Sequence, residues 1–242
     1  MNEETFKNIF SNEARQGFLT TRGHVKSTWN AALVLVALGV LARAATADMK
    51  ITFDETNPGE LPKGWETGIT GKGKAKWEVV SDDTAPSRPN VLKQSGEATF
   101  TWAAKTDEHI QDGFAEVKFK PIAGKEDQAG GIVFRFRDAN NYYIVRANAL
   151  EDNVVLYKTV NGKRSSLQVK GRTFGYGVDT NVPSRKWSTL RVEFHGNLFT
   201  VFFNRKKLFE VEDDTFKDAG AVGVWTKADS VTLFDDFSFG TK

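Results

Sequence analysis

Apolar and polar side chains alternate with a period of two in several segments of this chain. Phe114–Lys120 reads FAEVKFK, Ile132–Arg137 reads IVFRFR and Leu190–His195 reads LRVEFH. A period of two is typical of β-strands that bury one face. In the second segment we expect the first, third and fifth residues on the buried face and both arginines on the opposite face.

Short turn sequences separate these segments. Asn161-Gly162 lies between VVLYKTV and SSLQV, Gly196-Asn197 follows LRVEFH, and Asn204–Lys207 leads into LFEVE. Asn-Gly is a strong signal for a two-residue hairpin turn. Regular short strands joined by such turns predict an all-β fold, an antiparallel two-sheet β-sandwich or jelly roll, in one domain.

The N-terminal 47 residues differ from the rest of the chain. The apolar run Ala31–Ala42 (AALVLVALGVLA) follows Lys26 and precedes Ala45-Thr46-Ala47. A basic segment, a short apolar segment and a small-residue cleavage site form a secretory signal peptide. Twelve apolar residues are too few to span a bilayer, which needs about 20. We therefore expect residues 1–47 to be removed during export to the periplasm or the extracellular space.

This signal peptide is long, because 30 residues precede its apolar run and three of them are glutamates. Translation from Val25 would give a signal of ordinary length. In either case the mature domain is expected to comprise residues 48–242, without a membrane span.

Charge and cysteine content exclude several functions. Five of the 33 basic and three of the 31 acidic residues lie in residues 1–47, so 28 of each remain and the mature net charge is zero. Nucleic-acid binding and attraction to an anionic membrane are not expected of such a surface. The absence of cysteine excludes disulfides, thiolate metal sites and a cysteine nucleophile.

Long stretches of the mature chain resemble the concanavalin A-like lectin and glucanase superfamily, and within it bacterial exported 3-keto-disaccharide-hydrolase-like or laminin-G-like domains. The stretches that carry the resemblance are FDETNPGELPKGW (53–65), DDTAPSRPNVLKQ (82–94), DQAGGIVFRFRDANNYYIVRANALEDNVVLYKTVNGKR (127–164), LFEVEDDTF (208–216) and AGAVGVWTKADSVTLFDDF (219–237). The resemblance implies two antiparallel sheets, one of them concave, and a tendency to act on sugars. It does not fix the chemistry, because function resides in sites and not in folds.

One set of alternating residues could bind a saccharide on the concave sheet. This candidate set comprises Arg135, Arg146, Asn148, Trp225 and Lys227. A flat aromatic ring stacks on a sugar, and amide or guanidinium donors bind its hydroxyls. Arginine also suits a carboxylate-bearing sugar. The alternative is a solvated sheet face with cross-strand ion pairs, such as Arg146 with Glu151 or Asp229.

A structural calcium site is a further candidate. Asp235 alternates with apolar residues in TLFDDFSF (232–239), and a buried carboxylate requires a partner. Jelly rolls related to this fold often carry calcium where the first and last strands meet, so Asp235 or Asp236 could join Asp54 or Glu55. The alternative is that Asp235 accepts hydrogen bonds from the backbone or an arginine.

Catalytic motifs are weak. Glu210 and Glu212 alternate on one strand, but no third carboxylate completes the Glu-x-Asp-x-Glu motif of laminarinases. We therefore expect an exported, lectin-like carbohydrate-binding sandwich without clear catalytic machinery. One alternative is a 3-keto-glycoside or glycoside hydrolase that uses Glu151 or Asp229 on the concave face. The other is a structural or protein-interaction domain.

Overall fold

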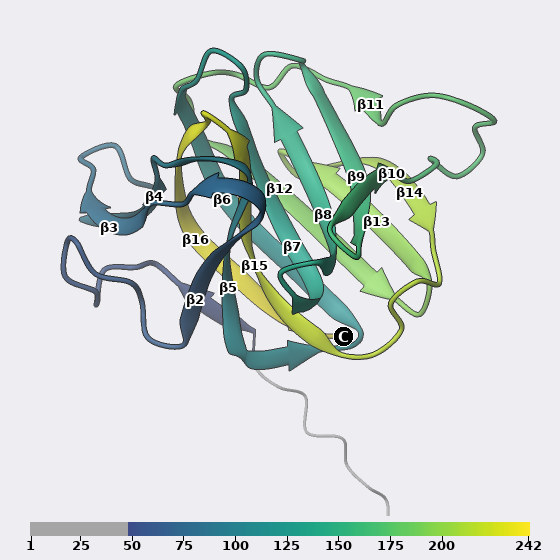
Figure 1. The fold of residues 1–242 in the computed structure, drawn as a ribbon, viewed down its shortest axis with the longest axis horizontal. Coiled ribbons are helices and arrows are strands. Elements are labelled where there is room, and N and C mark those ends of the chain that lie inside the picture. The colour runs from purple at the N-terminus through teal and green to yellow at the C-terminus, as the bar shows by residue number, and fades with distance from the viewer. Residues whose placement is uncertain (1–47) are drawn as a thin grey trace, which may run out of the picture. The chain divides into compact units, whose positions relative to one another are not determined.

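The computed structural model describes residues 48–242, which contain sixteen β-strands and no helix (Figure 1). Because residues 48–242 contain no helix, none of them belongs to a helix that could cross a membrane. The strands form two eight-stranded sheets, and every strand pairing is antiparallel. The all-β two-sheet sandwich predicted from the sequence is confirmed.

Sheet A contains, in spatial order, β14 (Lys206–Glu212), β13 (Leu198–Phe203), β12 (Ser188–His195), β6 (Gly113–Ala123), β16 (Val231–Thr241), β4 (Asn90–Gln94) and β3 (Trp77–Ser81), with β1 (Met49–Ile51) paired to β16. Sheet B contains β10 (Lys163–Ser166), β9 (Asn153–Val160), β8 (Asn141–Asn148), β7 (Ala129–Asp138), β15 (Gly220–Ala228), β5 (Glu97–Ile110) and β2 (Trp65–Lys74), with β11 (Val178–Asp179) paired to β9. All three alternating segments lie within strands.

The predicted turns also lie where expected. Asn161 and Gly162 join β9 to β10, and both have positive φ angles, of 51° and 77°. Positive φ at both central residues is the conformation of a type I′ hairpin turn, which Asn-Gly favours. Gly196 and Asn197 join β12 to β13, and of these two residues only Gly196 has a positive φ angle, of 56°.

The main core fills the space between the sheets. Phe134 of β7 stacks on Tyr143 of β8 and on Phe194 of β12, with ring centroids 5.2 and 5.1 Å apart. Phe199 of β13 packs edge-on against Phe134 and Tyr143. Offset and edge-to-face aromatic pairs are favourable beyond their buried area. These rings join the two sheets.

A bulge interrupts the alternation in β7. Arg135 has a φ of +44°, and the register with β8 shifts after Phe134. As a result Phe136 lies on the outer face of sheet B and not on the core face with Ile132 and Phe134, as the strict period had predicted. An extra residue in one strand reverses the side-chain directions that follow it.

A second core covers the outer, concave face of sheet B. Trp225 and Tyr142 are fully buried on this face, with Trp102, Phe136 and Tyr157 around them. The sheet curls until β2 reaches β8, where the Thr70 hydroxyl donates to the carbonyl of Ala139. Because that proton is used, the hydroxyl of Tyr142 donates to Thr70 Oγ1, at 2.7 Å.

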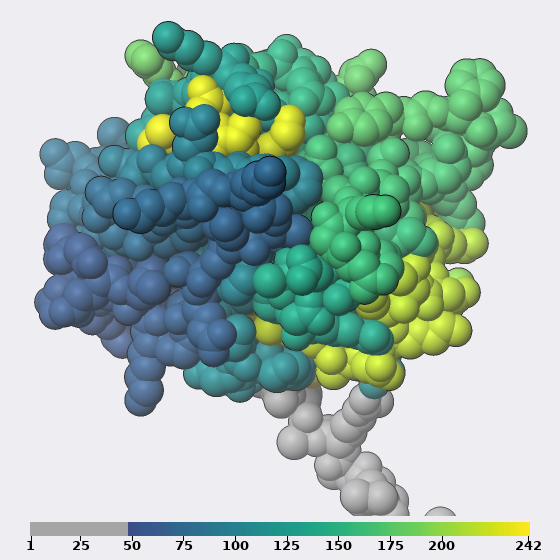
Figure 2. Space-filling model, in the orientation of Figure 1, coloured from purple at the N-terminus to yellow at the C-terminus, as the bar shows by residue number. Residues whose placement is uncertain are grey.

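The curled face turns toward the viewer in Figure 1. Figure 2 shows blue atoms from the region of β2 and green atoms from the region after β9 meeting on this side. Gly162 of the β9–β10 turn and Thr70 of β2 lie close together where the two regions meet, because a Cβ on Gly162 would lie 4.0 Å from Thr70 Cγ2. The concave face is therefore bridged across its middle.

Candidate functional site

One row of directly paired residues crosses the concave face. Gly68 pairs with Trp102, Trp102 with Trp225, Trp225 with Gly131, and Gly131 with Arg146. Directly opposed residues of neighbouring strands point to the same face. Trp225 and Arg146 therefore share the face predicted for them, with only the side-chain-free Gly131 between.

Trp225 is not available to stack on a sugar. Its side chain is completely buried. Phe100 packs over it with ring centroids 5.4 Å apart, and the guanidinium carbon of Arg164 lies 5.6 Å from its centroid. The aromatic residue that the sequence offered as a stacking surface thus forms the floor beneath other side chains.

Arg146 forms an ion pair within the protein. Its Nη1 and Nη2 donate to the two carboxylate oxygens of Glu151, each at 2.9 Å. The ring of Tyr157 lies 5.6 Å from the Arg146 guanidinium carbon. Burial tends to raise the pKa of Glu151, but hydrogen bonds from Arg146 and the amides of Asn153 and Asn148 hold it below its usual value. The ion pair between Arg146 and Glu151 that the alternative named is therefore present, but Arg146 is buried and Glu151 lies in the turn after β8 instead of on a neighbouring strand of a solvated face.

Asn148 and Lys227 hold a buried carboxylate between them. Asn148 Nδ2 donates to Asp127 Oδ1 at 2.7 Å, and Lys227 Nζ donates to Asp127 Oδ2. Asp127 and Asn148 are both buried. Of these three residues only Lys227 is partly exposed, and it reaches the edge of a pocket.

Arg135 does not join the concave site, because the β7 bulge turns it to the other side of the sheet. Its side chain is 1% exposed, and it donates to the carbonyls of Gln111, Phe216 and Gly196 at 3.0, 2.8 and 2.7 Å. Asp112 is its counter-ion, at 3.2 Å. The assignment of Arg135 as a ligand-binding residue of this face is therefore corrected: it ties the ends of strands and turns together.

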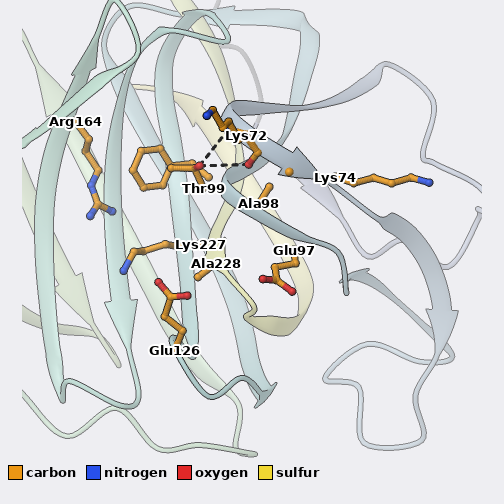
Figure 3. A pocket seen from close by; sticks show the side chains of 11 residues that line it. Lys72, Lys74, Glu97, Ala98, Thr99, Glu126, Arg164, Lys227 and Ala228 are labelled. Atoms are coloured by element: carbon orange, nitrogen blue, oxygen red, sulfur yellow. Dashed lines mark hydrogen bonds between the residues drawn. The ribbon is translucent and has the colours of Figure 1, made fainter.

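The open part of the concave face is a pocket of about 670 Å³ beside the bridge between β2 and β8 (Figure 3). Its lining comes from β2, β5, β10, β15 and the loop before β7, and comprises Lys72, Gly73, Lys74, Glu97, Ala98, Thr99, Phe100, Glu126, Arg164, Lys227 and Ala228. Charged groups of both signs surround a partly buried phenyl ring. This mixture can stack on one face of a polar ligand and bond its hydroxyls.

Of the residues that line this pocket, sequence reasoning identified only Lys227, and it missed Arg164 and Phe100 in particular. Its guanidinium carbon lies 4.3 Å from the ring centroid of Tyr157 and 4.5 Å from that of Phe100. Phe100 alternates with Trp102 in the sequence TFTW, a signal as good as that of Trp225 and Lys227. Arg164 carried no such signal, because only the curl of the sheet brings β10 over β5.

Asp229 shapes the loop that carries Glu126. Its carboxylate accepts hydrogen bonds from the backbone N–H groups of Lys125, Glu126 and Asp127, the shortest at 2.6 Å. Burial acts to raise the pKa of Asp229, but these three N–H groups hold it below its usual value. With its oxygens occupied, Asp229 is a loop anchor beside the pocket.

Glu210 and Glu212 lie on sheet A, away from this face. Both point outward from β14, whose Phe209 and Val211 enter the core. Lys207 pairs with Glu210 at 2.6 Å and Lys170 with Glu212 at 2.5 Å. The structure therefore does not bring this pair together with Glu151 or Asp229.

The four carboxylates considered for calcium have protein partners or lie apart. Asp235 accepts from the N–H groups of Ser87 and Asp236, at 2.7 and 2.6 Å. Asp236 pairs with Lys50 and Lys118, Asp54 accepts from the N–H of Asn90, and Glu55 is exposed. Between residues 48 and 242, no three acidic or histidine side chains form a group that could hold a metal ion.

A bulge at Asp236 separates Asp235 from the face of the residues that follow it. Asp236 has a φ of +49°, and the register between β16 and β6 shifts between Asp235 and Ser238. Phe237 and Phe239 therefore enter the main core, while Asp235 faces the segment around Ser87. Strict alternation had placed all three on one face. Burial raises the pKa of Asp235 to about 6. The backbone N–H donors of Ser87 and Asp236 act to lower this pKa, and the nearby charges of Asp236 and Asp54 act to raise it further.

A family model and several solved structures match this chain. The family model of the 3-keto-alpha-glucoside-1,2-lyase-like domain matches residues 49–237. No curated protein matches the chain.

Several solved structures share the fold. The carbohydrate binding module CBM66 from Bacillus subtilis is 19% identical with a TM-score of 0.58, covering 74% of this chain and 96% of its own. The cellulose induced protein Cip1 is 12% identical with a TM-score of 0.56, covering 80% and 97%. A Bacillus subtilis protein of unknown function with a galectin-like fold is 12% identical with a TM-score of 0.51, covering 74% and 90%. At these identities the likeness concerns the fold alone.

Proposed function

The chain belongs to the family of 3-keto-alpha-glucoside-1,2-lyase-like domains, and we propose that it binds a saccharide in the pocket beside Arg164 and Phe100. The observation that carries this proposal is the pocket itself, about 670 Å³ in volume. Ligand pockets of roughly 300–1,000 Å³ are typical for small molecules. The partly exposed ring of Phe100 offers a stacking surface, and the charged groups around it offer donors and acceptors for hydroxyls.

The family and the fold support a sugar as the ligand. The matching family model is named for an activity on a keto-glucoside, and one structural neighbour is a carbohydrate binding module. Binding alone is the function favoured here. Glu151 and Asp229, the acids considered for catalysis on this face, are occupied by protein donors.

A lyase activity is the second candidate, because the family model describes one. Elimination beside a ketone takes a proton from the neighbouring carbon, breaks the bond to the glycosidic oxygen to form a carbon–carbon double bond, and leaves the departing oxygen to take up a proton. It needs a base for the carbon-bound proton and positive groups to stabilise the enolate. The pocket holds two exposed carboxylates, those of Glu97 and Glu126, together with the cation Arg164 and with Lys227, whose charge Asp127 offsets. In this role Glu126 would be the base.

The test is a glycan array screened with the full-length protein, together with incubation of every array glycan and its 3-keto form with the protein and analysis of the sugars released. Retention of unchanged glycans supports binding without catalysis. Release of an unsaturated or shortened product that Glu126→Gln abolishes supports the lyase. A blank array together with no released product would contradict both candidates and favour a structural or protein-interaction domain. Glu210→Gln, on the outer face of sheet A, is the matched control.

We also infer that the protein is exported. This inference rests on the apolar run Ala31–Ala42 and the Ala45-Thr46-Ala47 sequence that follows it, in residues outside those the structure describes. N-terminal sequencing of the protein recovered from a secreting host should begin near Asp48. A chain that retains Met1 would contradict export by cleavage.

A further inference from the structure

We propose that the saccharide bound in this pocket carries an anionic substituent, a carboxylate or a sulfate ester, which Arg164 binds. The inference rests on the proposed saccharide-binding function and specifies its ligand. Three features of the pocket support it: the aromatic rings around the Arg164 guanidinium, the lack of a carboxylate partner for Arg164, and the positions of the charged side chains.

Aromatic rings hold the Arg164 guanidinium in place. Its carbon lies 4.3, 4.5 and 5.6 Å from the ring centroids of Tyr157, Phe100 and Trp225. Aromatic faces attract a cation and limit the movement of its side chain. They supply no hydrogen-bond acceptor in the guanidinium plane, so the N–H donors of Arg164 remain to be used.

Within residues 48–242, the side chain of Arg164 makes no hydrogen bond and no ion pair, and its Nη1 is buried without a partner. Other arginines of the domain differ. Arg146 pairs with Glu151, Arg135 with Asp112, and Arg191 with Glu193. Among the arginines of residues 48–242 that are buried or half-buried, Arg164 is the one without a carboxylate partner, whereas the other unpaired arginines, such as Arg205, are exposed. A partly buried charge without a partner is costly.

The charges of the pocket are unevenly distributed. Figure 3 shows Arg164 and Lys72 in the upper part of the view and the carboxylates of Glu97 and Glu126 in the lower part. Lys227 is already neutralised by Asp127. A ligand can therefore place an anion at the Arg164 end and hydroxyls near the two glutamates.

Binding of any sugar removes water from Arg164. A neutral sugar would leave the guanidinium charge without compensation in a drier site, which weakens binding. A carboxylate or sulfate would compensate that charge and accept two parallel hydrogen bonds from the guanidinium. Selectivity for the acidic form over the neutral form of the same sugar follows.

The test uses an array of gluco- and galacto-oligosaccharides, each backbone present in a neutral, a 6-sulfated and a C6-carboxylate form. Calorimetry with the full-length protein in 20 mM salt then compares the forms of the best backbone. We expect the carboxylate or the sulfate to bind at least tenfold more tightly than the neutral form. That ratio should fall as the salt concentration rises. Comparison of the two acidic arms identifies the anion.

Arg164→Gln should abolish the preference and Arg164→Lys should retain part of it. Arg205→Gln, in the turn between β13 and β14 of sheet A, should change nothing. Equal affinity for neutral and acidic forms would overturn this inference and leave the saccharide-binding function intact. Binding to no glycan would overturn both. The wild-type comparison alone decides the question if Arg164→Gln fails to fold.

Discussion

The ring of Trp102 occupies the space that a side chain of Gly68 would fill. The two residues pair directly between β5 and β2, and a Cβ on Gly68 would lie 2.4 Å from Trp102 Cζ2. Trp102 in turn packs on Phe136, with centroids 4.7 Å apart. A glycine at this position therefore sets how closely β2 can approach the aromatic floor of the concave face.

Gly68→Ala should destabilise the domain by about 1–3 kcal/mol, because the added Cβ overlaps the indole of Trp102, which can yield only by giving up its packing on Phe136. Urea unfolding measures the change. Lys74→Ala, at an exposed site on the same strand, is the control and should stay within about 0.5 kcal/mol of the wild type. Equal midpoints for both variants would contradict the packing described here.

The hydrogen bond between Thr70 and Tyr142 should couple the stabilities of β2 and β8. Thr70→Val and Tyr142→Phe should each cost about 1 kcal/mol or somewhat more, since Thr70→Val also leaves the carbonyl of Ala139 without its donor. A double-mutant cycle by chemical denaturation should give a coupling free energy of about 1 kcal/mol. Strictly additive losses would argue against the bridge.

Glu151→Ala should destabilise the protein by leaving the buried Arg146 without its counter-ion. Breaking a fully buried pair costs about 3–5 kcal/mol. Because the side chain of Glu151 is 36% exposed, solvent screening should reduce this to about 2 kcal/mol. Thermal unfolding measures the loss. Adding Arg146→Met should restore part of the stability, and a double variant less stable than the single one would contradict the explanation.

Asp235 should give a specific dependence of stability on pH. Its pKa is raised from 3.8 to about 6, so the folded state binds its proton more tightly than the unfolded state. The free energy of unfolding contributed by this group is therefore fully present below pH 4 and is lost as the pH rises through about 6.

Asp235→Asn removes this titration. The difference in unfolding free energy between wild type and variant should then fall by at most about 3 kcal/mol between pH 4 and pH 6.5. The comparison isolates Asp235 from carboxylates such as Asp82 and Asp213, whose lowered pKa values act in the opposite direction. A difference that is constant with pH would show that Asp235 stays ionised.

Local sequence pattern predicted the strands and turns, because period-two alternation and the Asn161-Gly162 signal act over a few residues. It failed at the two bulges. Arg135 and Asp236 adopt positive φ angles that nothing in their residue types requires, and each reverses the faces of the residues that follow. Bulges depend on pairing with a neighbouring strand, which single-strand patterns do not contain.

The candidate site was predicted in part for a similar reason. Alternation correctly placed Trp225 and Arg146 on one face, but the exposure of that face depends on how far the sheet curls. The approach of β10 to β5 buries Trp225 and creates the pocket around Arg164. These contacts join residues more than 60 positions apart in the chain, so local periodicity cannot predict them.

The bridge between Thr70 and Tyr142 divides the concave face into two pockets. Along β2, Glu66 lines a separate pocket beyond the bridge and Lys72 lines the Arg164 pocket, with Thr70 between them. A long chain cannot thread from one pocket to the other across the sheet. Under the proposed function, a saccharide would enter the Arg164 pocket by a terminus or a side branch, so the sites available on a polysaccharide would scale with its number of chain ends. Fragmentation of the polymer multiplies those sites without any change in its mass.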